Sequence, residues 1–342
     1  MAEVVVDFRS DTLTRPSAAM REAMAAAEVG DDVFDEDPTL HELQAHVAEL
    51  FGHEAALFCP SGTMANQIAL QLAVPRGEEL LCDAAAHVVT DEIGAAAALG
   101  GVSTRTWPSA AADLDPATVA EMIRPDGFVA VPTRAVALEQ THNRLGGAVI
   151  PLATLRSLRT VADEAGVHLH CDGARIWHAH VADGVPLADY GRLFDSLSVC
   201  LSKGLGAPVG SLIVGSAERI AAARKLRKRL GGGMRQAGIL AAAGLYALRH
   251  NIPRLAEDHE RAHRLAVALA PHGVVDPARI RTNIVPLDLS GASVDGPAFA
   301  AAARAEGILV SVLGRRLVRL VTHMDQTADG IDHAVKVLPT LV

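Results

Sequence analysis

The sequence reads Leu197-Ser-Val-Cys-Leu-Ser-Lys203-Gly-Leu-Gly206-Ala-Pro208 where an apolar strand pattern ends. The strand delivers a lysine into a glycine-rich turn, in which its amine is poorly solvated and a bulky ligand can approach the backbone. Such an amine is suited to attack a carbonyl group and form a Schiff base. Alternatively, Lys203 is an ordinary surface lysine whose stem covers apolar surface. The chain has three other lysines, Lys225, Lys228 and Lys336.

A carboxylate ends the strand pattern that precedes this one. Residues 167–172 alternate between apolar and polar side chains and end in Asp172, followed by Gly173-Ala174-Arg175. A lysine and an aspartate at strand ends fit the needs of pyridoxal phosphate. The lysine bonds to the aldehyde, and the aspartate keeps the pyridine nitrogen protonated. The structural alternative is that Asp172 caps the helix that follows.

A candidate phosphate site precedes both residues in the chain. Pro60-Ser61-Gly62-Thr63 lies between a strand pattern and a helix pattern. Free backbone N–H groups, the helix dipole and small hydroxyl side chains favour an anion at such a helix start. Because serine and threonine are also common N-cap residues, a simple helix cap is the other interpretation.

Strand and helix patterns alternate through most of the chain. Helix patterns begin after Asp37-Pro38-Thr39 and recur at 63–73 and 152–165. This alternation predicts an α/β fold with a mostly parallel seven-stranded sheet, helices on both faces, and functional residues at the carboxyl ends of strands. The predicted strands are residues 55–59, 80–83, 102–107, 135–139, 167–172, 197–201 and 211–214.

The pattern changes near Tyr246. We expect a long helix from there, strand-like runs at 281–289 and 308–321, and a final helix. A chain of 342 residues exceeds a comfortable single core. We therefore predict a large cofactor-binding domain of residues 1–245, including the N-terminal segment, and a small C-terminal α+β domain of residues 246–342.

Composition narrows the functional classes. The net charge of -9 disfavours binding to nucleic acid or to an anionic membrane. The N-terminus lacks a signal-peptide pattern and no apolar stretch reaches membrane-spanning length, so a cytoplasmic location is expected. The four cysteines lie in or at the end of apolar runs without metal-site spacing, which predicts buried free thiols. They are Cys59, Cys82, Cys171 and Cys200.

Seven motifs, in a single order along nearly the whole chain, resemble those of low-specificity L-threonine aldolases. That family is one of fold-type I pyridoxal phosphate enzymes in the beta-eliminating lyase group. The resemblance implies reversible cleavage of L-threonine or L-allo-threonine to glycine and acetaldehyde. The motifs are Asp7 to Pro16, Gly30 to Val33, Gln140 to Asn143, Asp172 to Arg175, Leu201 to Gly206, Gly231 to Gln236 and Arg319 to His323.

The resemblance also implies which residues hold the cofactor. By this resemblance Lys203 carries pyridoxal phosphate as a Schiff base, Asp172 pairs with the ring nitrogen and His87 stacks on the ring. The remaining expected cofactor contacts are Ser61, Gly62, Thr63, Arg175 and Arg235.

Substrate contacts follow from the same resemblance. Ser10, Arg175 and Arg319 are expected to bind the substrate carboxylate, a task that suits the planar donor pair of a guanidinium. A base must take the β-hydroxyl proton, and imidazole is suited because its ordinary pKa lies near neutrality. His142, which follows the strand at 135–139 and is expected to contact substrate, and His87 are the candidates.

Assembly and one departure from the family complete the comparison. Arg235 matches a residue that reaches a phosphate across a subunit interface, so we expect a homo-oligomer, a dimer of dimers with the active site at the dimer interface. The basic run Arg224 to Arg229 is expected at that contact. Phe34 stands where many members of the family have tyrosine, so any hydrogen bond from that hydroxyl is missing here.

Three competing interpretations stay open. His168, His170, Asp172, His178 and His180 suit a divalent metal, and period-two spacing places the first three on one strand face. That alternative leaves Lys203 unexplained, so we predict no metal site. Other fold-type I reactions, such as β-elimination or racemisation, use the same lysine and aspartate. A binding protein without catalysis is the third class, and it has no need for these elements.

Overall fold

A seven-stranded sheet forms the centre of the computed structural model, which describes residues 6–109 and 113–342. The strand order is β2-β8-β7-β6-β5-β3-β4, and within this sheet only β8 runs antiparallel to its neighbours. The predicted mostly parallel α/β sheet is therefore confirmed. Its strands are β2 (Ala55–Cys59), β3 (Glu79–Asp83), β4 (Ser103–Trp107), β5 (Thr133–Glu139), β6 (His168–Gly173), β7 (Ser196–Cys200) and β8 (Ser211–Gly215).

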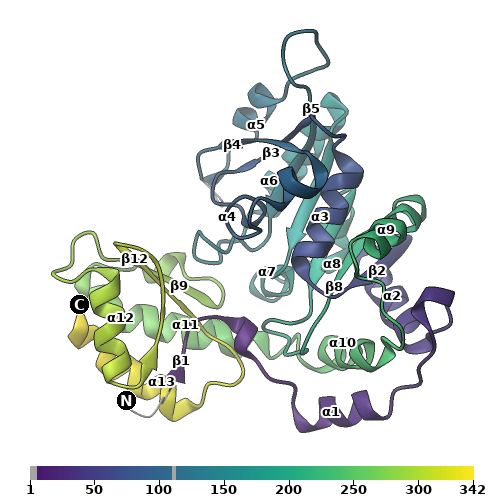
Figure 1. Ribbon diagram of the computed structural model, residues 1–342. Coiled ribbons are helices and arrows are strands. Elements are labelled where there is room, and N and C mark those ends of the chain that lie inside the picture. The colour runs from purple at the N-terminus through teal and green to yellow at the C-terminus, as the bar shows by residue number, and fades with distance from the viewer. Residues whose placement is uncertain (1–5, 110–112) are drawn as a thin grey trace.

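Helices cover both faces of this sheet (Figure 1). The helix α2 begins at Pro38, where Asp37 accepts the N–H of Leu40, and ends before Gly52 in the left-handed conformation that glycine adopts without strain. The helices of this part are α1 (Ala18–Ala25), α2 (Pro38–Phe51), α3 (Gly62–Ala73), α4 (His87–Thr90), α5 (Pro116–Met122), α6 (Leu152–Ala165), α7 (Ile176–Asp183), α8 (Leu187–Gly191), α9 (Ala217–Arg229) and α10 (Gly238–His250).

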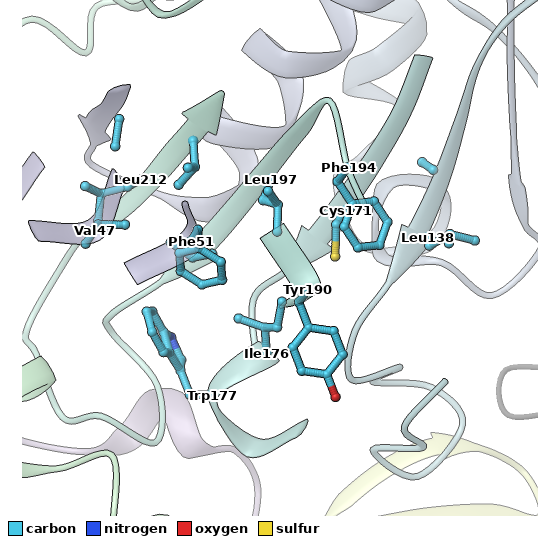
Figure 2. Close-up of a cluster of buried hydrophobic side chains, with 14 of the residues drawn as sticks. Val47, Phe51, Leu138, Cys171, Ile176, Trp177, Tyr190, Phe194, Leu197 and Leu212 are labelled. Atoms are coloured by element: carbon cyan, nitrogen blue, oxygen red, sulfur yellow. The ribbon is translucent and has the colours of Figure 1, made fainter. Parts of the chain in front are cut away.

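Strand side chains alternate between two different environments. On β2, Ala56 and Phe58 belong to the large core cluster, whereas Leu57 and Cys59 belong to a smaller cluster with residues of α3 and α9. Figure 2 shows part of the large core, where Val47 and Phe51 of α2 and Trp177 of α7 lie near Leu197 and Leu212 of the sheet. The large core is built from apolar side chains, and their close packing holds the sheet in place.

The face toward α3 is polar in its middle. His168, His170 and Asp172 of β6 alternate with Leu169 and Cys171, which enter the large core. The same face carries Ser196 and Ser198 of β7, which are paired in register with His170 and Asp172. Buried polar groups need partners, and here they lie on the neighbouring strand and on α3.

A smaller region follows the sheet in the chain. An antiparallel sheet of order β11-β12-β9 and a parallel pair β1-β10 share one apolar cluster. Val6 and Phe8 belong to that cluster, so the N-terminal strand lies beside C-terminal elements (Figure 1). These elements are β1 (Val6–Asp7), β9 (Ile284–Asp288), β10 (Ile308–Leu309), β11 (Ser311–Gly314), β12 (Leu317–Val321), α11 (Leu255–Leu269), α12 (Gly296–Ala305) and α13 (Ala328–Val337).

The long helix predicted from Tyr246 is wrong, because it is two helices. The first, α10, ends at His250 and α11 begins at Leu255. Pro253 lies between them, where its missing N–H and its ring are incompatible with a continuous helix. The apolar clusters change over within α11, since Leu255 joins the large core and Ala262 the smaller one. The domain division at residue 246 stays a prediction.

Two further sequence expectations concern the cysteines and membrane-spanning segments. All four cysteines, which lie in the described part of the chain, are buried free thiols as predicted. None of the helices within residues 6–109 and 113–342 has the length and apolar character to cross a membrane.

Asp37 supplies a test of how the helices are held. One carboxylate oxygen caps α2 at 3.0 Å from the N–H of Leu40, and the other accepts the N–H of Gly238 at 2.7 Å. Asp37→Ala should therefore lower the free energy of unfolding by about 2–3 kcal/mol, measured by denaturant titration. Asp115→Ala, which removes the exposed cap of α5, is the matched control and should cost about 1 kcal/mol. Equal losses in the two variants would contradict the prediction.

Candidate active site

The carboxyl ends of the parallel strands meet at one edge of the sheet, and most of the predicted site residues lie there. Asp83 ends β3, Glu139 ends β5, Asp172 lies at the end of β6, and Lys203 follows β7. Ser61 follows β2, which runs in the same direction. Separate strands thus converge on one place, as the alternation of strands and helices predicts.

Lys203 is held in a tight turn. Its carbonyl oxygen accepts the N–H of Gly206 at 2.9 Å and the hydroxyl of Thr14 at 2.8 Å. Gly206 has φ +79°, and a Cβ at that position would meet the sulfur of Met324 at 2.6 Å, so only glycine fits. Lys203 is half-buried, whereas the other three lysines, all in the described part of the chain, are exposed.

Asp172 is a buried carboxylate with two hydrogen-bond donors. Its Oδ1 accepts the N–H of Ala174 at 3.0 Å, and its Oδ2 accepts Nδ2 of Asn66 at 2.7 Å. Burial by itself would raise the pKa of Asp172, but the charges of His87 and Lys203 and the hydrogen bond from Asn66 bring it below the ordinary value. The helix-cap alternative fails, because α7 has Arg175 at its N-cap and no side chain caps it.

His87 opens the short helix α4 beside Asp172. Its Nδ1 lies 2.9 Å from Oε1 of Glu92, and its backbone N–H donates to Oε2 of Glu139 at 2.8 Å. Burial lowers the pKa of His87, but the hydrogen bond to Glu92 and the charge of Asp172 outweigh burial and raise it above the ordinary value. The imidazole is therefore fixed at one nitrogen by a carboxylate.

The predicted phosphate site is the start of α3. Ser61 is its N-cap and accepts the N–H of Met64 at 3.2 Å, so the cap interpretation of Ser61 is correct. Gly62 and Thr63 occupy the first turn, where backbone N–H groups have no partner within the helix. A Cβ at Gly62 would lie 3.5 Å from the hydroxyl of Ser211, which is buried without a hydrogen-bond partner. This arrangement of donors fits an anion.

Two arginines lie near each other on the side of the small region. Arg175 donates from Nε and Nη2 to Asp11 at 2.8 and 2.6 Å, and both side chains are buried. Arg319 donates to Oδ1 of Asn143 at 2.6 Å, and its buried Nε has no partner. Burial and the charge of Arg175 lower the pKa of Arg319 to about 10, so it remains a cation at neutral pH. An unpaired cationic donor fits a carboxylate ligand.

His142 lies just beyond β5 and is buried. Its Nε2 is 3.5 Å from Oδ1 of Asp83, and among the described residues neither ring nitrogen makes a well-aligned hydrogen bond. Burial lowers the pKa of His142, but Asp83 and then Glu139 raise it above the ordinary value. For Asp83, burial raises the carboxyl pKa, but the interactions with His142 and with other hydrogen-bond donors together outweigh burial and lower that pKa to about 2.

Two predicted residues, Ser10 and Arg235, make no hydrogen bond to this group within the described part of the chain. Ser10 caps the 3-10 turn Asp11–Leu13 by accepting the N–H of Thr12. Arg235 is exposed, and its backbone oxygen accepts the N–H of Asp32. Phe34 is 72% exposed. In the basic run, Arg227 is buried and donates to the carbonyl of Phe58 and to Asp32.

The histidine cluster considered as a metal site is dispersed. His178 contacts His259, His180 contacts the carbonyl of Val185, and His168 and His170 share Ser196. Among residues 6–109 and 113–342, the three ligand atoms that come within 4.8 Å of one another belong instead to His87, Glu92 and Asp172. The carboxylates of that group are already hydrogen-bonded to Asn66.

Several residues of the site were missed by sequence reasoning. Asp11, which holds Arg175, lies inside a quoted motif but carries no local signal for its partner. Asn66 and Glu92 lie in helical or irregular segments far from Asp172 in sequence. For these residues the needed signal is a spatial contact, which a single sequence does not contain.

The residues present fit pyridoxal phosphate. The lysine in the glycine turn matches the aldehyde of the cofactor, and the anion site at the start of α3 matches its phosphate. The buried aspartate, whose pKa is lowered by the charge of that lysine, matches the ring nitrogen. The unpartnered hydroxyl of Ser211 and the unpartnered Nε of Arg319 are donors available to a ligand.

Comparisons with known proteins show which family this chain resembles. Residues 7–292 match the family model described as "Beta-eliminating lyase". The chain is 45% identical to the low specificity L-threonine aldolase of Escherichia coli K12, over 96% of each chain. It is 41% identical to low-specificity L-threonine aldolase 1 of Arabidopsis thaliana, over 96% of this chain and 94% of that protein.

Solved structures extend the comparison to the fold. A Leishmania major threonine aldolase superposes with a TM-score of 0.83 at 21% identity, covering 98% of this chain and 99% of that one. A Sphingomonas wittichii serine palmitoyltransferase has a TM-score of 0.75 at 16% identity, with 98% and 87% covered. These two likenesses concern the fold alone.

The Asp83–His142 pair predicts a pH-dependent stability. A raised imidazole pKa stabilises the fold fully below the ordinary value of 6.5, and this contribution is lost as pH rises through the folded-state pKa. The lowered Asp83 pKa acts above its ordinary value of 3.8. Asp83→Asn should therefore cost about 1 kcal/mol more unfolding free energy at about pH 5.5 than at about pH 9.

Denaturant titration at both pH values measures this difference. Glu79→Gln is the control, because Glu79 is a buried carboxylate whose ionic partners are Arg105 and Arg124, which keep their charge over this range. Its cost should not change between the two pH values. The same result for Asp83→Asn would show that Asp83 does not hold a protonated His142.

Proposed function

Because this chain belongs to the beta-eliminating lyase family, we propose that the Lys203–Asp172 site is the active site of its L-threonine aldolase activity. The chain is a pyridoxal phosphate-dependent lyase that cleaves L-threonine to glycine and acetaldehyde. One observation supports the site assignment above the others. The lysine that is not exposed lies at the carboxyl end of β7, one strand away from an ionised, buried aspartate.

The cofactor contacts follow from these positions. When bound, pyridoxal phosphate supplies an electron sink for the electron pair released as a bond to the substrate Cα breaks. Lys203 is the residue that would hold it covalently. Asp172, kept ionised by its hydrogen-bond donors, would accept a hydrogen bond from the protonated ring nitrogen. The imidazole of His87 would cover the ring. Gly62 and Thr63 offer their N–H groups to the phosphate.

The arginines would orient the substrate. Which bond to Cα breaks depends on how the amino acid is held, and its carboxylate is the natural anchor. Arg319 donates to Asn143 and to the carbonyl of Arg9, and its Nε has no partner, so it has a donor left for a carboxylate. Arg175 is already bidentate to Asp11, which fixes its plane and leaves fewer donors for the substrate. We therefore assign the larger part of carboxylate binding to Arg319.

His142 is the proposed base for the β-hydroxyl proton. It has a buried imidazole at the correct edge of the sheet, and Asp83 stabilises its protonated form at 3.5 Å. A base whose conjugate acid is stabilised takes up a proton more readily. His87 is engaged with Glu92 through Nδ1 and has the separate task of covering the ring.

Assembly is the remaining part of the proposal. Arg235 is exposed, and its side chain makes no hydrogen bond or ion pair with the described residues, which leaves its guanidinium available to a neighbouring subunit. Phe34 and Ile239, 72% and 44% exposed, are apolar side chains near the same loop. We propose a homo-oligomer, a dimer of dimers with Arg235 and the Arg224 to Arg229 run at the contact. A cytoplasmic location is proposed with it.

Covalent attachment tests the site. Borohydride reduction of the holoenzyme followed by peptide mapping should place the pyridoxyl group on Lys203, and Lys203→Ala should lose the absorption band of the Schiff base between lysine and cofactor. Lys336→Ala, in an exposed position of α13, is the control that should keep both signals. A label on Lys225, Lys228 or Lys336 would refute the assignment.

The two histidines should differ in what they affect. His142→Ala should lower kcat for L-threonine by about 10²–10⁴-fold and change the ratio of L-threonine to L-allo-threonine cleavage, with cofactor affinity retained. His87→Ala should weaken pyridoxal phosphate binding as well as activity. Steady-state assays of acetaldehyde and equilibrium dialysis of the cofactor measure these effects. Wild-type rates and ratio in His142→Ala would leave His87 or a water as the base.

A further inference from the structure

The alternating histidines of β6 have a role that the cofactor contacts do not explain. His168 and His170 lie on the same strand face as Asp172 and both contact Ser196 of β7, at 2.8 and 2.9 Å from its hydroxyl oxygen. The other nitrogen of His170, Nε2, lies 3.3 Å from Oδ1 of Asn66. A chain of hydrogen bonds therefore runs along the buried polar face to α3.

Asn66 is the end of this chain and the start of the active site. Its Nδ2 donates one hydrogen to Oδ2 of Asp172 at 2.7 Å and the other to Oε1 of Glu92 at 2.8 Å. Its Oδ1 accepts from the hydroxyl of Ser198 and from His170. All four partners are consistent with one orientation of the amide, since carboxylates only accept and the other two groups can donate.

The network also fixes the protonation of His170. To donate to Asn66, Nε2 must carry a hydrogen, and Nδ1 then accepts from Ser196. Burial lowers the pKa of His170 to about 4, against the pull of Asp172, so the ring is neutral at neutral pH. A neutral imidazole with one hydrogen gives the chain a single direction, from Ser196 toward Asp172.

We propose that Asn66 is a positioning residue of the active site, whose amide, oriented by His170 and Ser198, holds Asp172 ionised and aligned toward the cofactor ring nitrogen. This inference rests on the proposed role of Asp172. The same amide fixes Glu92, which binds Nδ1 of His87. One side chain of α3 thereby sets the two residues proposed to contact the cofactor ring.

Electrostatics explains why an amide is needed between these groups. Oxygen atoms of Asp172 and Glu92 lie within 4.8 Å of each other in a buried region. Two buried carboxylates at this distance repel each other, and an amide that donates one hydrogen to each offsets that repulsion. Without the amide, Asp172 would become protonated more readily, and a protonated Asp172 would no longer accept a hydrogen bond from a protonated ring nitrogen.

Cofactor analogues can isolate this effect from folding and from activity. The affinities of the apoprotein for pyridoxal phosphate and for its carbocyclic analogue, in which C–H replaces the ring nitrogen, should be measured by equilibrium dialysis. The two ligands have the same shape, so only a group that acts on the ring nitrogen changes their ratio. Wild-type protein should prefer pyridoxal phosphate, and Asn66→Ala should reduce that preference by about tenfold.

Gln71→Ala is the matched control. Gln71 is an amide on the same helix that donates only to the carbonyl of Gln67, so its removal should leave the ratio unchanged. A folded Asn66→Ala protein with the wild-type ratio would overturn the proposal. If Asn66→Ala does not fold, Ser198→Ala tests the same chain by removing the donor to Oδ1, and it should lower the ratio in the same direction. An unchanged ratio in that variant overturns the proposal equally.

Asp172→Asn separates this inference from the proposed function. If Asp172→Asn lowers the ratio and Asn66→Ala does not, the role of Asp172 stands and that of Asn66 is wrong. If Asp172→Asn keeps the wild-type ratio, Asp172 does not act on the ring nitrogen. The assignment of Asp172 and this inference then fail together. The threonine aldolase activity of the chain still stands, because it rests on the family relationship.

Discussion

The ionised state of Asp172 is the constraint on which the rest of the site depends. A carboxylate buried to this degree is stable as an anion only if donors and positive charges surround it. Backbone Ala174, the amide of Asn66, His87 and Lys203 provide them from four segments of the chain. The fold must bring all four together before any of them has a catalytic use.

The sheet solves this by giving its two faces different tasks. One face enters an almost wholly apolar core, which supplies rigidity through close packing. The other carries the polar chain from His168 to Asp172 under α3. Because side chains of a strand alternate strictly, β6 places Leu169 and Cys171 in the apolar core and His170 and Asp172 on the polar face. Packing on the apolar face thereby fixes the register of the polar face.

Prediction from sequence succeeded where the signal was local. Strands such as β2 and β6 follow from period-two or apolar runs, and α2 from its cap and its closing glycine. Lys203 and Asp172 were singled out because each lies at or just beyond the end of such a run, and the structure places both at the carboxyl edge of the sheet. Asn66 was missed because it resembles any polar residue on an amphipathic helix. The break near Pro253 was missed because helical periodicity continues on both sides of the proline. Partners that are distant in sequence leave no local trace.

The pairing of β1 with β10 has a consequence for biosynthesis. Val6 lies opposite Ile308, so β1 is synthesised long before the strand that pairs with it. Until then Val6 and Phe8 are exposed apolar side chains on a nascent chain, a state prone to wrong contacts. The central sheet, by contrast, can form once β8 has emerged. Folding of the small region should therefore be completed only when β10 has been made and pairs with β1.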